Sequence, residues 1–298
     1  MRGKYGQILT VLKGTDIRLF LLAVLVYMAG LLVGSVRLQF IAKVQAIALT
    51  FYQTVSLTYI GYFFNNFLPT SIGGDVIKGY YLSKKTVDKT GSYTSVFIDR
   101  AIGLVTMVFM AFVALFFVNG NIVGQSVKNM VYAITAVSIL GIVFLINKNF
   151  ARKFAGLLTV VKPLENQLKK AYDAIHSYRH HTLLMFYTFM VSIIGQLLYF
   201  ASIGILALSI GSHIPPIDIL IRMPIVSIMS LLPSINGLGV REGSTVFLFA
   251  PLIGKENAFA VSVLVIVTLL INSVVGGLIY AISPQFKMKL KDIEGSAA

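Results

Sequence analysis

Long stretches without a charged side chain constrain this chain more than any other feature of its sequence. Five stretches contain no Asp, Glu, Lys or Arg, at residues 44–74, 101–127, 129–147, 182–217 and 257–286. A helix needs roughly 20 apolar residues to cross about 30 Å of hydrocarbon. One such stretch would fit the core of a soluble protein, but five would not. Because no stretch alternates in polarity as a membrane strand does, the sequence predicts an all-α integral membrane protein, a polytopic helix bundle.

The distribution of Lys and Arg predicts how the chain is oriented. Basic residues gather at the N-terminus, at 78–89, at 148–179 and at the C-terminus. Such residues favour the cytoplasmic side, so both termini are expected in the cytoplasm, in a prokaryotic inner membrane. The net charge of +14 is explained by the same bias and by anionic lipid, without a nucleic-acid partner. The expected spans are Ile17–Ser35, Lys43–Phe64, Tyr93–Val118, Val127–Ile146, Thr182–Gly211 and Asn257–Ser283.

Two further segments complete this single transmembrane domain of residues 1–298. Residues 148–181 are basic, with apolar residues at helical spacing, which predicts an amphipathic helix on the cytosolic membrane surface. The first apolar run, Leu19–Val36, lacks a small-residue cleavage site and leads into further apolar segments, so it is expected to be a span and not a signal peptide. Residues 217–253 must begin and end on the same side of the membrane if the flanking loops are both outside. This parity predicts a re-entrant hairpin of two half-length helices.

Two irregular segments in opposite halves of the chain share their order of residues. The first reads LPTSIGGD at residues 68–75 and the second reads LPSINGLGVREG at residues 232–243. Gly- and Pro-interrupted apolar segments in corresponding positions of two halves indicate a transporter binding site. Unwound backbone in hydrocarbon is tolerated only where protein or a water-filled cavity satisfies its polar groups. The pair therefore predicts two broken-helix hairpins, an inverted repeat and a central polar cavity.

Charged residues beside these segments are the candidate site, because charges within membrane segments are costly and usually functional. Arginine can bind a lipid phosphate through two hydrogen bonds, and nearby carboxylates can balance the arginines or contact a cationic headgroup. The alternative is that these charges form structural ion pairs that hold the hairpins together. The candidate headgroup-binding residues are Arg100, Arg241, Lys78, Asp75, Asp99, Glu242, Ser71, Gly73, Gly74, Asn236, Gly237 and Gly239.

Three ordered motifs carry a resemblance to a known family. The segments LPTSIGGDVIKGYYLSKK, SVFIDRAIGLV and LLPSINGLGVREG resemble the transmembrane flippase domain of the lysylphosphatidylglycerol synthase family, the membrane half of the bacterial multiple peptide resistance factor. The matches run from Pro69 to Lys78, from Asp99 to Leu104 and from Pro233 to Gly243. The resemblance implies two re-entrant elements around a cavity that moves aminoacylated phospholipid between leaflets, a role in antimicrobial peptide resistance. The chain ends about 15 residues after its last span, so the family's cytosolic aminoacyltransferase domain is not expected in it.

These observations favour a lipid translocator, a flippase or scramblase, over two alternatives. The expected cargo is an aminoacyl-phosphatidylglycerol, another anionic phospholipid or a polyprenyl-linked glycolipid. No GxxxxGK[ST] segment for ATP and no cysteine is present, so no cofactor and no metal are expected. The first alternative is a membrane-embedded lipid transferase, of the phosphatidylglycerol lysyltransferase or glycosyltransferase type, which would need paired carboxylates. The second is a membrane subunit for a partner lipid-modifying enzyme, and a homodimer also remains open.

Overall fold

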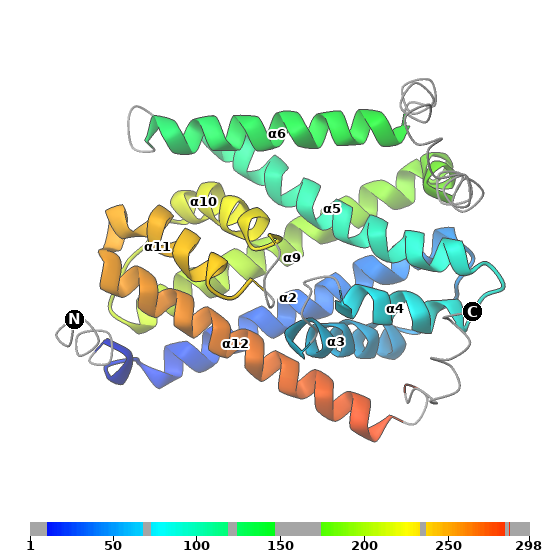
Figure 1. The fold of residues 1–298 in the computed structure, drawn as a ribbon, viewed down its shortest axis with the longest axis horizontal. Helices are drawn as coiled ribbons and strands as arrows, with labels where there is room; N and C mark the ends of the chain where they lie inside the picture. The colour runs from blue at the N-terminus through cyan, green and yellow to red at the C-terminus, as the bar shows by residue number, and fades with distance from the viewer. Residues whose placement is uncertain are drawn as a thin grey trace.

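The computed structural model describes residues 11–67, 73–118, 124–146, 174–232, 237–283 and 286. The longer elements in these ranges are all helices (Figure 1). In chain order they are α2 (Ile17–Val44), α3 (Phe51–Phe67), α4 (Gly73–Ser83), α5 (Lys89–Leu115), α6 (Gln125–Ile146), α9 (Thr182–Ser209), α10 (Pro216–Met229), α11 (Val240–Ile253) and α12 (Lys255–Ile282), with a 3₁₀ turn at Tyr178–His180. The predicted all-α fold is confirmed. Most of the predicted amphipathic helix at 148–181 lies outside the described residues.

Five of the described helices are long and apolar enough to cross a membrane: α2, α5, α6, α9 and α12. The prediction of Lys43–Phe64 as a full span was wrong, because α3 has only 17 residues and begins at Phe51. The first helix is correspondingly longer than predicted and continues through Arg37 to Val44. Arg37 therefore lies within a helix and not in a loop. Two short helices, α10 and α11, stand where two half-length helices were predicted, and 14 residues rise only about 21 Å.

The described helices repeat in order. α2 and α9 each have 28 residues, and α5 and α12 have 27 and 28. Each long pair encloses two short helices separated by a break, α3 and α4 in the first half and α10 and α11 in the second. The contacts between the halves correspond too, because α3 packs on α12 while α10 packs on α5. This arrangement agrees with the predicted inverted repeat, and Figure 1 shows the two short-helix hairpins in opposite halves of the bundle.

Contacts at the helix ends show that the two halves run in opposite directions. The Asp16 amide, just before α2, donates to the Ser209 carbonyl at the end of α9 at 2.7 Å. Beyond the other end of α2, Gln45 Nε2 donates to Ser177 Oγ at 2.9 Å, just before α9 begins. α2 and α9 are therefore antiparallel. They approach closely in between, where a Cβ on Gly30 would lie 3.3 Å from the Gly195 carbonyl oxygen.

The hairpins enter the bundle from opposite ends. A buried cluster joins the end of α2, the residues before α3, the end of α4 and Phe286; it includes Ala42, Ile47, Leu82 and Phe286. The α3–α4 hairpin thus begins and ends near the end of α12. At the other end, short connections join α9 to α10 and α11 to α12, so the α10–α11 hairpin begins and ends there. Whether the hairpins are re-entrant in a bilayer stays a prediction.

The two flanks of the described bundle lie at opposite ends of it. The start of α2 lies beside the end of α9, whereas the end of α12 lies at the opposite end of the bundle (Figure 1). The α3–α4 hairpin contributes to this arrangement, because it returns to the end from which it started. The side of the membrane that each terminus faces stays a prediction.

A buried ion pair holds the second hairpin together. Arg222 Nε in α10 donates to Asp218 Oδ1 at 2.9 Å, one helical turn away, and both side chains are buried. Arg222 Nη1 also donates to the Leu248 carbonyl of α11 at 2.6 Å. An ion pair shielded from water resists separation, because removing one partner leaves the other charge uncompensated. The pair therefore fixes α10 against α11 within an otherwise apolar region.

Candidate functional site

A cavity of about 340 Å³ lies between the two halves of the bundle. Its lining comes from α2, α3, α4, α5, α9, α10, α11 and α12, so both halves contribute. Six charged side chains line it, four cationic and two anionic: Arg37, Lys78, Arg100, Arg241, Asp75 and Asp99. Such a concentration of charge is unusual between helices this apolar. The cavity is therefore a polar site within the membrane-spanning part of the molecule.

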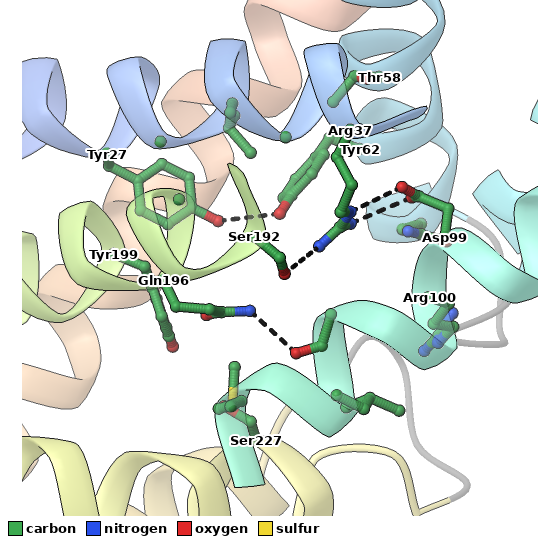
Figure 2. Close-up of a pocket in the computed structure, with 18 of the residues that line it drawn as sticks. Tyr27, Arg37, Thr58, Tyr62, Asp99, Arg100, Ser192, Gln196, Tyr199 and Ser227 are labelled. Carbon is green, nitrogen blue, oxygen red and sulfur yellow. Dashed lines mark hydrogen bonds and ion pairs between the residues drawn. The ribbon is translucent and has the colours of Figure 1, made fainter. Parts of the chain in front are cut away.

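Arg37 and Asp99 form an ion pair with two hydrogen bonds in this lining. Arg37 Nε donates to Asp99 Oδ1 at 2.7 Å, and Nη2 donates to Oδ2 at 3.1 Å. The third guanidinium nitrogen, Nη1, donates to Ser192 Oγ at 3.2 Å, which ties α2 and α5 to α9 (Figure 2). Gly103 leaves room for this guanidinium, because a Cβ there would lie 2.8 Å from Nη1.

Asp75 is the second carboxylate and lies between two cations. Arg100 Nη1 donates to Asp75 Oδ2, and Lys78 Nζ lies 3.5 Å from Oδ1. Lys78 is buried because it passes over the bare backbone of Gly61, where any Cβ would overlap the lysine stem. Asp75 therefore joins α4, which follows the first break, to Arg100 in α5.

The other end of the cavity is aromatic and uncharged apart from Arg241. Tyr27 and Tyr62 share a hydroxyl–hydroxyl hydrogen bond of 3.3 Å. The Tyr27 and Tyr199 rings pack edge to face, with their centroids 5.8 Å apart. Figure 2 shows these three rings together with Gln196, away from Asp99 and Arg100. Arg241 lines the same cavity as Tyr27 and Tyr199.

Residues near the facing ends of the paired short helices line the cavity. Asn65 and Asp75 lie near the facing ends of α3 and α4, and Leu231 and Arg241 lie near those of α10 and α11. The Gly74 amide donates a hydrogen bond of 2.7 Å to Asn65 Oδ1. This bond satisfies one of the backbone N–H groups at the start of α4 that have no acceptor within the helix. Gly74 packs against the Gly61 carbonyl, and any Cβ would overlap it.

Glycine and a carboxylate shape the start of α11. Gly237 and Gly239 have φ of +78° and +81°, a region that strongly favours glycine. The Gly239 amide donates to Glu242 Oε2 at 2.7 Å, which is the half of a capping box that the N3 glutamate provides. Glu242 therefore stabilises the beginning of the helix that carries Arg241 into the cavity.

The structure brings together five of the predicted site residues. Asp75, Lys78, Asp99, Arg100 and Arg241 line the cavity. Five others shape the adjoining helix starts without lining it: Gly73, Gly74, Gly237, Gly239 and Glu242. Ser71 and Asn236 lie outside the described residues.

Sequence reasoning missed Arg37 and the tyrosine–glutamine end. Arg37 carried a signal, because four of the five residues at 38–42 on its far side are apolar. The tyrosines carried none, since tyrosine is also expected at membrane interfaces. The pairing of the charges was also not readable from the sequence. Arg37 donates to Asp99, whereas Arg100, the chain neighbour of Asp99, donates to Asp75.

The geometry suits non-covalent binding of a polar group. Among the described residues, no three His, Asp or Glu side chains gather where they could hold a metal. Both carboxylates of the cavity are already held by cationic side chains. The lining also contains more cationic than anionic groups, together with tyrosine hydroxyls and an amide, a set that binds anions and hydroxyl groups.

Comparisons with known proteins agree with this architecture. The family model described as the lysylphosphatidylglycerol synthase TM region matches residues 4–276. The chain is also similar to the UPF0104 membrane protein PH1989 of Pyrococcus horikoshii, with 25% identity over 303 aligned positions that cover 89% of this chain and 87% of the relative. No solved structure matches the chain.

Proposed function

The chain belongs to the family of the lysylphosphatidylglycerol synthase TM region, and from that premise we propose that it moves a polar-headed lipid between membrane leaflets without changing it chemically. A headgroup cannot cross hydrocarbon unless a polar path replaces its water. The observation that carries this proposal is the charged cavity, which is lined from both halves of the bundle by residues of the two short-helix hairpins. The lipid's acyl chains remain in the bilayer while the headgroup passes through the cavity.

The two short-helix hairpins are the transport elements of this proposal. Transporters with inverted repeats hold their cargo near the bilayer midplane, at discontinuous helices, and rock one repeat against the other. Here α4 and α11 begin beside the cavity, so their N-terminal amides and positive dipole ends favour an anionic group. In this proposal both hairpins are re-entrant, and exchange of access to the cavity between the two ends moves the lipid.

The end of the bundle that holds Ser83 and Lys89 is proposed to face the cytoplasm. It carries Lys43, Lys84, Lys85 and Lys89, and the basic stretch 148–179 leads into α9 at this same end. The end that holds Gly211 and Gly254 then faces outward. The membrane of this proposal is the inner membrane of a prokaryotic cell.

A leaflet-accessibility assay in proteoliposomes tests the proposal. Purified protein is reconstituted with a trace of fluorescent phospholipid, and a membrane-impermeant quencher is added from outside. Transport predicts that the quenched fraction rises from about half toward completeness, whereas protein-free liposomes stay at about half. The same purified protein, incubated with labelled aminoacyl or glycosyl donors, reports on transferase activity by product extraction. Turnover there together with no lipid movement would replace the proposal by the transferase alternative.

A further inference from the structure

We propose that the cavity selects a headgroup made of a phosphodiester and an uncharged polyhydroxyl group, such as glycerol or a sugar, over a headgroup that carries an ammonium. This inference rests on the proposed function, because it names the cargo class of the same site. Both a phospholipid and a polyprenyl phosphate sugar present this chemistry, and the experiment below separates them.

The first support is the balance of charge in the cavity. Four cationic and two anionic side chains line it, an excess of two positive charges. A headgroup with a net negative charge reduces that excess, whereas a lysyl ester of phosphatidylglycerol, with a net positive charge, increases it. Charges repel strongly where water is scarce, so the excess discriminates against the cationic headgroup.

The second support is the engagement of the carboxylates. An incoming ammonium group needs a carboxylate, and Asp99 uses both of its oxygens for Arg37. Both oxygens of Asp75 face cations as well, Arg100 on one side and Lys78 on the other. An ammonium would have to displace an arginine or lysine that is part of the fold. A phosphodiester requires no such exchange, because a guanidinium has five N–H donors and can bind an anion while it keeps its carboxylate partner.

The third support is the neutral end of the cavity. The hydroxyls of Tyr27, Tyr62 and Tyr199 can each donate and accept a hydrogen bond, as the hydroxyls of glycerol or a sugar require. Gln196 adds a carboxamide to this end. Its Nε2 donates to the Gly103 carbonyl at 3.2 Å, and this bond fixes the orientation of the Gln196 side-chain oxygen. Figure 2 shows these groups gathered on one side of Arg37.

Arg241 adds a cation to the cavity that these hydroxyls line. It lines the cavity together with Tyr27, Tyr62 and Tyr199. Its guanidinium fits there because Gly237 has no side chain: a Cβ would lie 3.2 Å from Arg241 Nη2. The structure thus assigns the phosphate to the neighbourhood of Arg241 and the polyol to the tyrosine hydroxyls.

Competition among defined lipids tests the selectivity. Proteoliposomes carry trace phosphatidylglycerol, lysyl-phosphatidylglycerol, phosphatidylcholine or a polyprenyl phosphate sugar, and the rate of leaflet exchange is measured for each. We expect phosphatidylglycerol or the polyprenyl phosphate sugar to move at least about tenfold faster than the lysyl lipid, because a reversal of charge at close range outweighs other headgroup differences. Whichever of the two moves faster identifies the source of the phosphate. Equal or faster movement of the lysyl lipid overturns the inference and leaves the proposed function intact.

A binding measurement keeps the two proposals separable. Protein in neutral detergent is titrated with short-chain phosphatidylglycerol or its lysyl ester, and thermal stabilisation is recorded. Preference for phosphatidylglycerol without any leaflet exchange would refute transport and support the selectivity. Equal stabilisation by both lipids refutes the selectivity, whatever the transport assay shows.

Matched variants locate the selectivity. Arg241→Gln removes the cation at the neutral end, and we expect the ratio of phosphatidylglycerol to lysyl-lipid binding to fall toward one. Arg241→Lys keeps the charge and retains most of the ratio. Lys255→Gln removes an exposed cation outside the cavity and should change nothing. An unchanged ratio in a folded Arg241→Gln protein would overturn the assignment of the phosphate.

Discussion

Separating Arg37 from Asp99 should destabilise the protein strongly. The pair has two charge-assisted hydrogen bonds, at 2.7 and 3.1 Å, and its side chains are only 16% and 10% exposed. Removal of one partner from such a buried pair costs about 3–5 kcal/mol, because the remaining charge is left without its counterion. We therefore expect Arg37→Met and Asp99→Asn each to lower the free energy of unfolding by about 3 kcal/mol.

The double variant gives this prediction its discriminating power. Arg37→Met combined with Asp99→Asn leaves no buried charge at this position, so its cost should be about 2–3 kcal/mol less than the sum of the single variants. Unfolding is followed by tyrosine fluorescence during titration of mixed micelles with a denaturing detergent. Additive effects, or single variants that cost under about 1 kcal/mol, would refute the view that this pair is a coupled, water-shielded contact.

The same variants separate the two roles predicted for the charged residues. A double variant that regains stability and still exchanges lipid identifies the pair as structural. A double variant that is stable but does not exchange lipid identifies it as part of the transport path. Asp99 was predicted as a headgroup ligand, and its engagement by Arg37 makes the structural role the expected one.

Three further predictions concern the framework of the site. Gly74→Ala should lower stability by at least about 2 kcal/mol because its Cβ overlaps the Gly61 carbonyl, whereas Gly141→Ala, with nothing within 4 Å, should be neutral in the same unfolding assay. Asp218→Asn should cost about 3 kcal/mol because Arg222 then loses its counterion; a small loss would mean that the Leu248 carbonyl suffices. The chain has no native cysteine, so single cysteines at Ala48 and Val87 should react with an impermeant maleimide from one side of the membrane. Those at His213 and Lys255 should react from the other side, and labelling of Ala48 and Val87 from different sides would rule out a re-entrant α3–α4 hairpin.

The sequence predicted the class of fold and the position of the site because both follow from local composition. A long stretch without charge indicates that hydrocarbon surrounds the helix. Such stretches located α5, α6, α9 and α12 to within a few residues. The paired Gly/Pro segments located both breaks, and the charges beside them located five residues of the cavity lining. These features are readable because hydrocarbon penalises charge and unpaired backbone wherever they occur along the chain.

The errors concern information that arises only when helices meet. Arg37 was left outside the first predicted span, which ended at Ser35, since nothing local reveals that Asp99, 62 residues later, neutralises it. Residues 43–64 were counted as a crossing on hydropathy, although the helix that forms has only 17 residues and pairs with α4. The tyrosine cluster depends on α2, α3 and α9 together, and no spacing within one segment indicates it.

The division of charges between the halves has a consequence for biogenesis. Asp99 and Asp75 are each neutralised by cations from the first half of the chain, and Asp218 is neutralised within α10. A nascent chain that has inserted only through α6 therefore already contains the counterions of its own carboxylates. Before α9 is synthesised, this half of the chain therefore exposes neither Asp75 nor Asp99 to lipid without a cationic partner. The second half of the chain then completes the cavity after the carboxylates of Asp75 and Asp99 have been neutralised.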